Sequence, residues 1–226
     1  MVVVYLTLGA LILCHLTPQK HVCMRSRRFL ALAEQQNLPA PKIRNDLRRT
    51  AVVMAVAAMD SYMHWLVFRR LSDGRREGDL PKSLAKLSVP FSDLASLADA
   101  LIAARRANRE VRPWVQVKSS VQKELLRETF QSFDQVASAL ALAGIEKGWS
   151  RTAEKIGCTA NDIKERLNRI VHRRNQIVHE GDITRASRPQ NLKYNSVEHD
   201  SVVDDVTWIK RLPTAIEEVV NEGNPT

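Results

Sequence analysis

The sequence has few of the residues that interrupt helices and few of those that build sheets. Glycine (8) and proline (9) are sparse among 226 residues, and aromatic residues make up only 5%. Few helix breakers and little clustering of β-branched or aromatic residues argue against a β-sandwich or β-barrel. A chain of this length buries a sizeable core without disulfides or metal. The composition therefore predicts a soluble, all-α fold.

Cysteine is equally scarce. The three cysteines, Cys14, Cys23 and Cys158, form no Cys-x-x-Cys pair. An odd and scattered set is typical of reduced thiols and not of a disulfide framework or a zinc site. The sequence therefore predicts a cytoplasmic protein that holds no structural metal.

The N-terminal residues 2–14 form an uncharged run. A helix that spans a bilayer needs about 20 apolar residues. A secretory signal has basic residues before its apolar run, and none precede this one. Met24 opens a stretch that resembles an ordinary soluble N-terminus. We predict that residues 1–23 are an apolar extension, either translated upstream of the true start or acting as a weak anchor. Residues 24–226 are then a single domain with no stable membrane span.

Apolar residues recur at helical spacing along the rest of the chain. Residues 51–68 are apolar nearly all round, which is typical of the central helix of a bundle. Asp60, Ser61 and His64 interrupt them and argue against a membrane span. The predicted helices cover 25–36, 42–71, a short stretch after Pro81, a stretch after Pro90, 114–143, 160–181 and a last stretch within 197–220.

Residues 149–167 have the pattern of a helix-turn-helix. Ala153, Gly157 and Ile163 have the spacing of the packing alanine, the turn glycine and the aliphatic residue of such motifs. The pattern is short, and two ordinary bundle helices show it as well. The second helix also continues beyond the point where a recognition helix ends, so the DNA-binding interpretation remains an alternative.

The helix predicted for 160–181 holds the most informative pattern. At about 100° per residue, Ile163, Leu167, Ile170 and Ile177 share one narrow apolar stripe, and Arg174 lies within it. A charge in such a stripe is costly unless it is paired or binds an anion. A second column beside the stripe holds polar residues at spacings of four, three and four, namely Asn168, His172, Asn175 and His179.

The string from Arg174 to His179 resembles the motif of the HEPN superfamily, an Arg followed after four to six residues by His. The wider string at residues 170–182 is similar to that of RiboL-PSP-type bacterial HEPN domains. The resemblance implies an up-and-down helical bundle of the HEPN type with additional short helices. It also implies metal-independent cleavage of RNA, in which the 2′-hydroxyl is the nucleophile and no cofactor is needed.

The resemblance also implies roles for single residues. Arg174 would stabilise the phosphate charge, His179 would act as general acid or base, and Asn175 would orient one of them. The motif helices of two protomers would meet, so a homodimer through residues 160–180 is expected, with Ile170, Arg174 and Ile177 at the seam. The accessory candidates are Asp60, His172 and Glu180, and the candidates for RNA contact are Arg169 and Arg173.

The charge distribution favours the same class of partner. The segment from Ser196 to the end carries seven acidic and two basic residues, so the net +9 divides into −5 there and +14 elsewhere. An excess of this size favours a nucleic acid. Three functions remain open: an endoribonuclease acting as a toxin or phage-defence effector with an antitoxin or defence partner, a non-catalytic RNA- or nucleotide-binding or scaffolding module, and a DNA-binding regulator.

Overall fold

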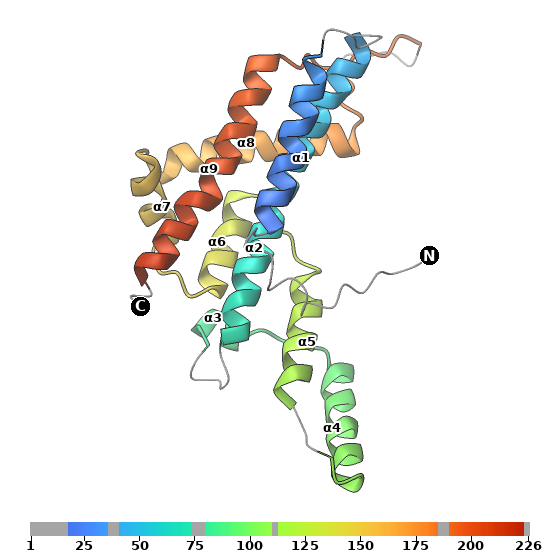
Figure 1. Ribbon diagram of the computed structural model, residues 1–226, viewed down its shortest axis with the longest axis vertical. Coiled ribbons are helices and arrows are strands. Elements are labelled where there is room, and N and C mark those ends of the chain that lie inside the picture. Colours follow the sequence, from blue (N-terminus) through green and yellow to red (C-terminus); the bar gives the residue numbers. More distant parts are fainter. Residues whose placement is uncertain (1–17, 36–40, 74–79, 110–112, 185–189, 224–226) are drawn as a thin grey trace. The chain divides into compact units, whose positions relative to one another are not determined.

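The computed structural model describes residues 18–35, 41–73, 80–109, 113–184 and 190–223. The described residues form helices and no strand, and Ile183 and Tyr194 form an isolated antiparallel bridge (Figure 1). The all-α prediction is confirmed. The helices are α1 Pro18–Ala33, α2 Pro41–Asp73, α3 Lys82–Ala85, α4 Phe91–Arg106, α5 Pro113–Leu125, α6 Phe133–Leu142, α7 Gly148–Ile156, α8 Ala160–His179 and α9 His199–Gly223.

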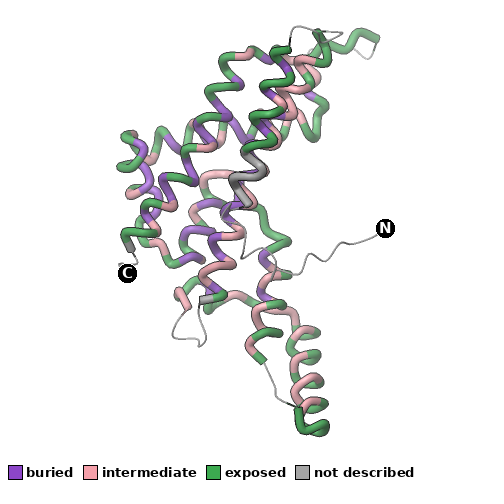
Figure 2. The backbone as a smooth tube through the Cα atoms, viewed as in Figure 1, coloured by how far each residue is buried: buried purple, intermediate pink, exposed green. Residues whose placement is uncertain are grey.

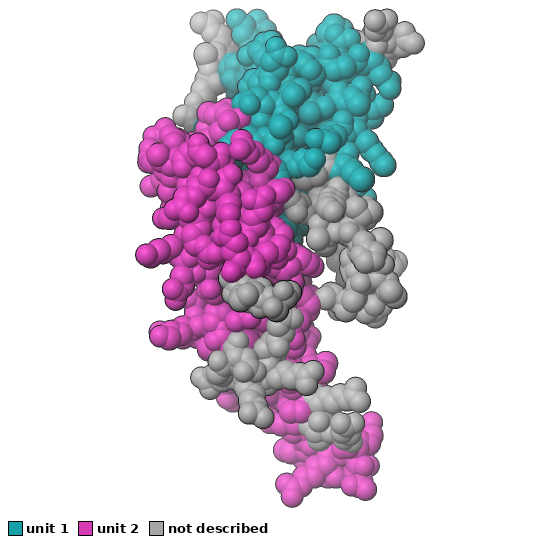
Figure 3. Space-filling model, turned by 60° about the vertical axis from the view of Figure 1, so that its left-hand side comes forward, with its two compact units in different colours: residues 1–62, 172–210 teal, residues 63–171, 211–226 magenta. Residues whose placement is uncertain are grey.

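The chain divides into two compact units (Figure 3). The first comprises Met1–Tyr62 and His172–Lys210, and the second comprises Met63–Val171 and Arg211–Thr226. Three helices, α2, α8 and α9, pass from one unit into the other along the chain. The predicted N-terminal run at residues 2–14 lies outside the described residues, and a start at Met24 stays a prediction.

In the first unit, α1 and the first half of α2 are joined by one buried and one exposed polar contact. The hydroxyl of Ser26, which is buried, donates to the carbonyl of Ala51 at 2.8 Å. Glu34 at the end of α1 accepts from Arg48 at 2.8 Å and pairs with His199 at 2.9 Å. The apolar core of this unit includes Val52, Val56, Met59, Tyr62, Val202, Val206 and Ile209.

In the second unit, α6, α7 and α8 pack around two aromatic rings. Phe133 and Trp149 stack with their centroids 4.6 Å apart. The indole N–H of Trp149 donates to the carbonyl of Phe133 at 3.1 Å, and the amide of Phe133 donates to Asn168 Oδ1 at 3.1 Å. Asn168, a member of the polar column on α8, therefore anchors the start of α6.

The prediction of one helix over residues 114–143 is wrong, because the structure has two helices, α5 and α6, separated at residues 126–132. Ser132 begins α6 with a capping box: its hydroxyl accepts from the amide of Gln135, and the Gln135 side chain accepts from the amide of Ser132 at 3.0 Å. These reciprocal bonds satisfy amide groups at a helix start. The apolar spacing continues through the break, which is why periodicity alone misses it.

Helix α4 buries none of its residues, and it contacts α5 (Figure 2). Phe91 at its first position is 83% exposed. Pro90 precedes the helix and provides no side-chain cap. Proline fixes its own φ in a range that suits the residue just before a helix.

Helix α2 is the one described helix that is long and apolar enough to cross a membrane, counted over residues 41–72. Within its most apolar window, 56% is buried inside the protein. The core helix of a soluble protein passes the same test by length and composition. The prediction that the chain has no stable span therefore stays a prediction.

Gly144 and Gly157 offer a matched test of backbone strain against steric overlap. Both have φ of +77°, a conformation that costs an L-residue about 1–2 kcal/mol. A Cβ on Gly157 meets no atom within 4 Å, whereas one on Gly144 lies 2.8 Å from Cγ of the rigid ring of Pro81. We expect Gly157→Ala to lower the free energy of unfolding by about 1–2 kcal/mol and Gly144→Ala to lower it more. Urea unfolding of the two variants measures the difference, and equal losses would contradict the overlap with Pro81.

Candidate active site

Helix α8 begins at a local cap. The hydroxyl of Thr159 accepts from the amide of Asp162 at 3.1 Å, and Asp162 accepts from the amide of Thr159 at 2.8 Å. The backbone and side-chain hydrogen bonds from Thr159 lower the pKa of Asp162. An acidic residue in the first turn also complements the helix dipole. The helix then runs 20 residues to His179, so the predicted start is confirmed and the helix ends two residues before the predicted Gly181.

The apolar stripe of α8 is covered over its first part and uncovered at its end. Ile163, Leu167 and Ile170 are completely buried within the chain, whereas Ile177 is half-buried and Val178 is 46% exposed. The expectation that Ile170 meets a second copy is wrong, because its own chain already covers it. Only the last two turns of α8 keep apolar surface for another molecule.

Arg174 is half-buried in these last turns. Its Nη1 donates to Oδ1 of Asn175 at 3.0 Å. Its Nε is buried and has no hydrogen-bond partner. The amide oxygen of Asn175 is neutral, so this contact orients the guanidinium and leaves its charge uncompensated. A buried N–H without an acceptor is costly, and an anionic ligand would supply the acceptor.

The other predicted site residues lie along the same helix end, with one exception. Asn175, His172, His179 and Glu180 are exposed, and the first of these is bonded to Arg174 and not to His179. Arg174 and His179 are five residues apart, about 140° round the helix. Asp60 is half-buried in α2.

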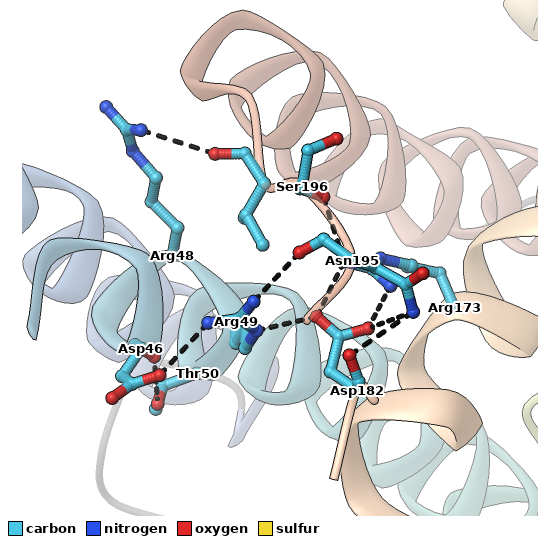
Figure 4. Close-up of polar contacts among 9 residues, drawn as sticks. Asp46, Arg48, Arg49, Thr50, Arg173, Asp182, Asn195 and Ser196 are labelled. Carbon is cyan, nitrogen blue, oxygen red and sulfur yellow. Dashed lines mark hydrogen bonds and ion pairs between the residues drawn. The ribbon is translucent and has the colours of Figure 1, made fainter. Parts of the chain in front are cut away.

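The structure adds a residue that the sequence reasoning missed, Asp182, which follows the end of α8. Its side chain is completely buried. It accepts from Nε of Arg49 at 2.6 Å, from both Nη atoms of Arg173, and from the side-chain amide of Asn195 at 3.0 Å (Figure 4). The carboxylate therefore ties α2, the end of α8 and the segment before α9 together.

The charge state of Asp182 follows from these bonds. Burial alone would raise the pKa of Asp182, but the hydrogen bonds from Arg49, Asn195 and Arg173 outweigh it and lower the pKa. The backbone joins the same arrangement, because the amide of Asp182 donates to the carbonyl of Gln176 at 3.0 Å. Gly181 and Asp182 have positive φ, which favours glycine and the short polar residues. An Asp directly after the helix-ending glycine was the available sequence signal.

Arg173 corrects part of the sequence interpretation. The sequence made it a candidate for RNA contact, but its guanidinium is bonded to Asp182 and to the carbonyl of Ser196 at 3.1 Å. The donors of Arg173 that were predicted for RNA are thus engaged within the chain. Arg169 lies exposed on α8, and its assignment to RNA contact stays a prediction.

Part of the basic excess is also neutralised within the chain. Glu217 in α9 pairs with Arg69 at 2.8 Å, and Glu222 pairs with Lys155 and with Arg151. Some of the acidic C-terminal segment therefore serves the fold of the second unit. The basic residues that stay exposed include Arg25, Arg27 and Arg28 in α1 and Arg105, Arg106 and Arg109 at the end of α4.

Comparison with known proteins places these features in a family. The family model RiboL-PSP-HEPN matches residues 25–222. The chain therefore belongs to the RiboL-PSP-HEPN family, a family of predicted ribonucleases, and its helices are consistent with the HEPN helical bundle. HEPN domains generally bind RNA. A search of curated proteins gave no match, nor did a search of solved structures.

Proposed function

We propose that the protein is a metal-independent endoribonuclease whose reacting groups are Arg174 and His179. The observation that carries the proposal is the guanidinium of Arg174, which is oriented by Asn175 and keeps a buried N–H without an acceptor. A phosphate oxygen is an acceptor of the required charge, and Arg binds phosphate with planar geometry.

The chemistry needs one base and one acid beside that phosphate. The 2′-hydroxyl of RNA loses its proton and attacks phosphorus, and the bond from phosphorus to the 5′-oxygen breaks as that oxygen gains a proton. The imidazole of His179, exposed at the end of α8, is suited to one of these transfers. The products are a 2′,3′-cyclic phosphate and a 5′-hydroxyl.

We propose further that two copies complete the active site through the last two turns of α8. Ile177 and Val178 retain exposed apolar surface there. A two-fold contact would bring both Arg174 residues near each other, and a phosphate between them offsets the repulsion. We assign the protein to the cytoplasm, as a toxin or defence effector restrained by a partner protein. Glu180, His172 and Asp60 remain accessory candidates.

The test is RNA cleavage by the purified protein in excess chelator. We expect a single-stranded oligoribonucleotide to be cut to products with cyclic phosphate ends, and the double variant with Arg174→Ala and His179→Ala to leave it intact. Glu165→Ala, an exposed change on the same helix, serves as the control. Cleavage by the double variant at the parent rate would overturn the assignment of the two residues.

The DNA-binding alternative is tested with the same preparation. Helices α7 and α8 do follow each other with a turn at Gly157, but α8 continues 20 residues and the family match covers both. Sequence-dependent binding of duplex DNA without any cleavage of RNA would replace the ribonuclease assignment with a regulator.

A further inference from the structure

Residues 182–184, which follow the end of α8, pair with residues 193–195. Ile183 and Tyr194 form the antiparallel bridge, the amide of Thr184 donates to the carbonyl of Lys193 at 2.8 Å, and the amide of Asn195 donates to the carbonyl of Asp182 at 2.9 Å. The backbone of Tyr194 is therefore fixed on both sides. Tyr194 lies opposite Ile183, and Ile183 is the fourth residue after His179.

The side chain of Tyr194 rests on a guanidinium that is itself held. Cζ of Arg49 lies 5.5 Å from the centre of the Tyr194 ring. Arg49 donates to Asp182 at 2.6 Å, to Asp46 at 3.0 Å and to the carbonyl of Asn195 at 2.9 Å. The three acceptors use Nε and both Nη atoms, so the plane of the guanidinium is fixed (Figure 4). A guanidinium held in this way supports one face of the Tyr194 ring and stays in place when the ring moves.

Tyr194 nevertheless leaves 58% of its surface exposed. An aromatic ring that is backed on one side and exposed elsewhere suits stacking against a flat, uncharged partner. Single-stranded nucleic acids are bound in this way, because every base has a π-face that stacks on an aromatic side chain.

We propose that Tyr194 is a base-stacking subsite for the single-stranded RNA that the protein cleaves. This inference rests on the proposed function and adds to it the recognition of an unpaired nucleobase beside the scissile phosphate. The subsite selects RNA in which a base is free to leave its stack, as in loops and single strands. Tyr194 contacts the substrate and takes no part in proton transfer.

The test measures binding and catalysis separately. In the His179→Ala background, a fluorescein-labelled single-stranded oligoribonucleotide stays intact, and its anisotropy reports Kd. We expect Tyr194→Ala to raise Kd by about 5- to 150-fold, the loss of one stacked base. Tyr194→Trp should keep the affinity. With the active protein, Tyr194→Ala should raise KM by a similar factor and leave kcat unchanged.

Phe91→Ala is the matched control, since Phe91 is also an exposed aromatic residue and lies in the second unit, on α4. It should change neither Kd nor KM. An oligoribonucleotide carrying 2-aminopurine should lose fluorescence on binding to the parent and less so with Tyr194→Ala. If Tyr194→Ala has the Kd and the KM of the parent, the proposal of a stacking subsite is wrong, and the ribonuclease proposal is unaffected. If the parent neither binds nor cleaves RNA, the proposed function fails, and the subsite fails with it.

Discussion

Replacing His179 by alanine is expected to lower the rate of RNA cleavage by about 10²–10⁴-fold, the usual contribution of a positioned general acid or base. The imidazole lies exposed at the end of α8, so its removal leaves no cavity and no unpaired buried group. Stability should therefore stay near that of the parent. Single-turnover cleavage of a labelled oligoribonucleotide, compared with a thermal melt of each variant, measures both quantities.

Chemical rescue separates a reacting His179 from a structural one. Because the side chain is exposed, added imidazole should reach the vacated position and restore part of the cleavage by His179→Ala. It should restore nothing in Arg174→Ala, which is expected to lose about 10²–10³-fold through the loss of charge stabilisation. Glu165→Ala should cleave like the parent. Parent-like cleavage by His179→Ala would remove the imidazole from the mechanism.

The features that the sequence predicted are those set by local rules. The bounds of α2 and α8 follow from apolar spacing and from Pro41 and Gly181. The neighbours Arg174 and Asn175 lie on one helix, and their contact needs no tertiary information. The capping box that starts α6, at Ser132 and Gln135, is equally local, but the prediction missed it because the apolar spacing continues through the break.

The features that the sequence did not predict depend on residues far apart in the chain. Arg49 lies 133 residues from Asp182, and no periodicity relates the two. Arg173 has the helical position of a solvated residue, but the chain turns back after Gly181 and brings Asp182 against it. Burial of Ile170 by its own chain, and the support of Tyr194 by Arg49, follow from the same long-range packing.

Asp182 should therefore be a sensitive position for the stability of the fold. We expect Asp182→Ala to lower the free energy of unfolding by about 3–5 kcal/mol, the usual cost of breaking a buried pair by removing one partner. The variant leaves the donors of Arg49 and Arg173 without their shared acceptor, and these side chains are only 12% and 23% exposed. Urea unfolding followed by circular dichroism measures the loss. A loss of less than about 1 kcal/mol would contradict this expectation, because it would mean that water replaces the carboxylate at little cost.

Asp46→Ala is the matched control, because Asp46 binds the same Arg49 from a position that is 73% exposed. A surface ion pair contributes about 0–1 kcal/mol, so the losses in unfolding free energy caused by the two substitutions should differ several-fold.

The pH dependence of the unfolding free energy adds a second readout. The pKa of Asp182 is lower in the folded chain than its ordinary value of 3.8, so the unfolded chain binds the proton more readily. The contribution of ionised Asp182 to the free energy of unfolding is complete above that value and is lost as the pH falls below it. The difference in unfolding free energy between the parent and Asp182→Ala should therefore be largest at neutral pH and shrink on acidification. The difference between the parent and Asp46→Ala should stay small at every pH.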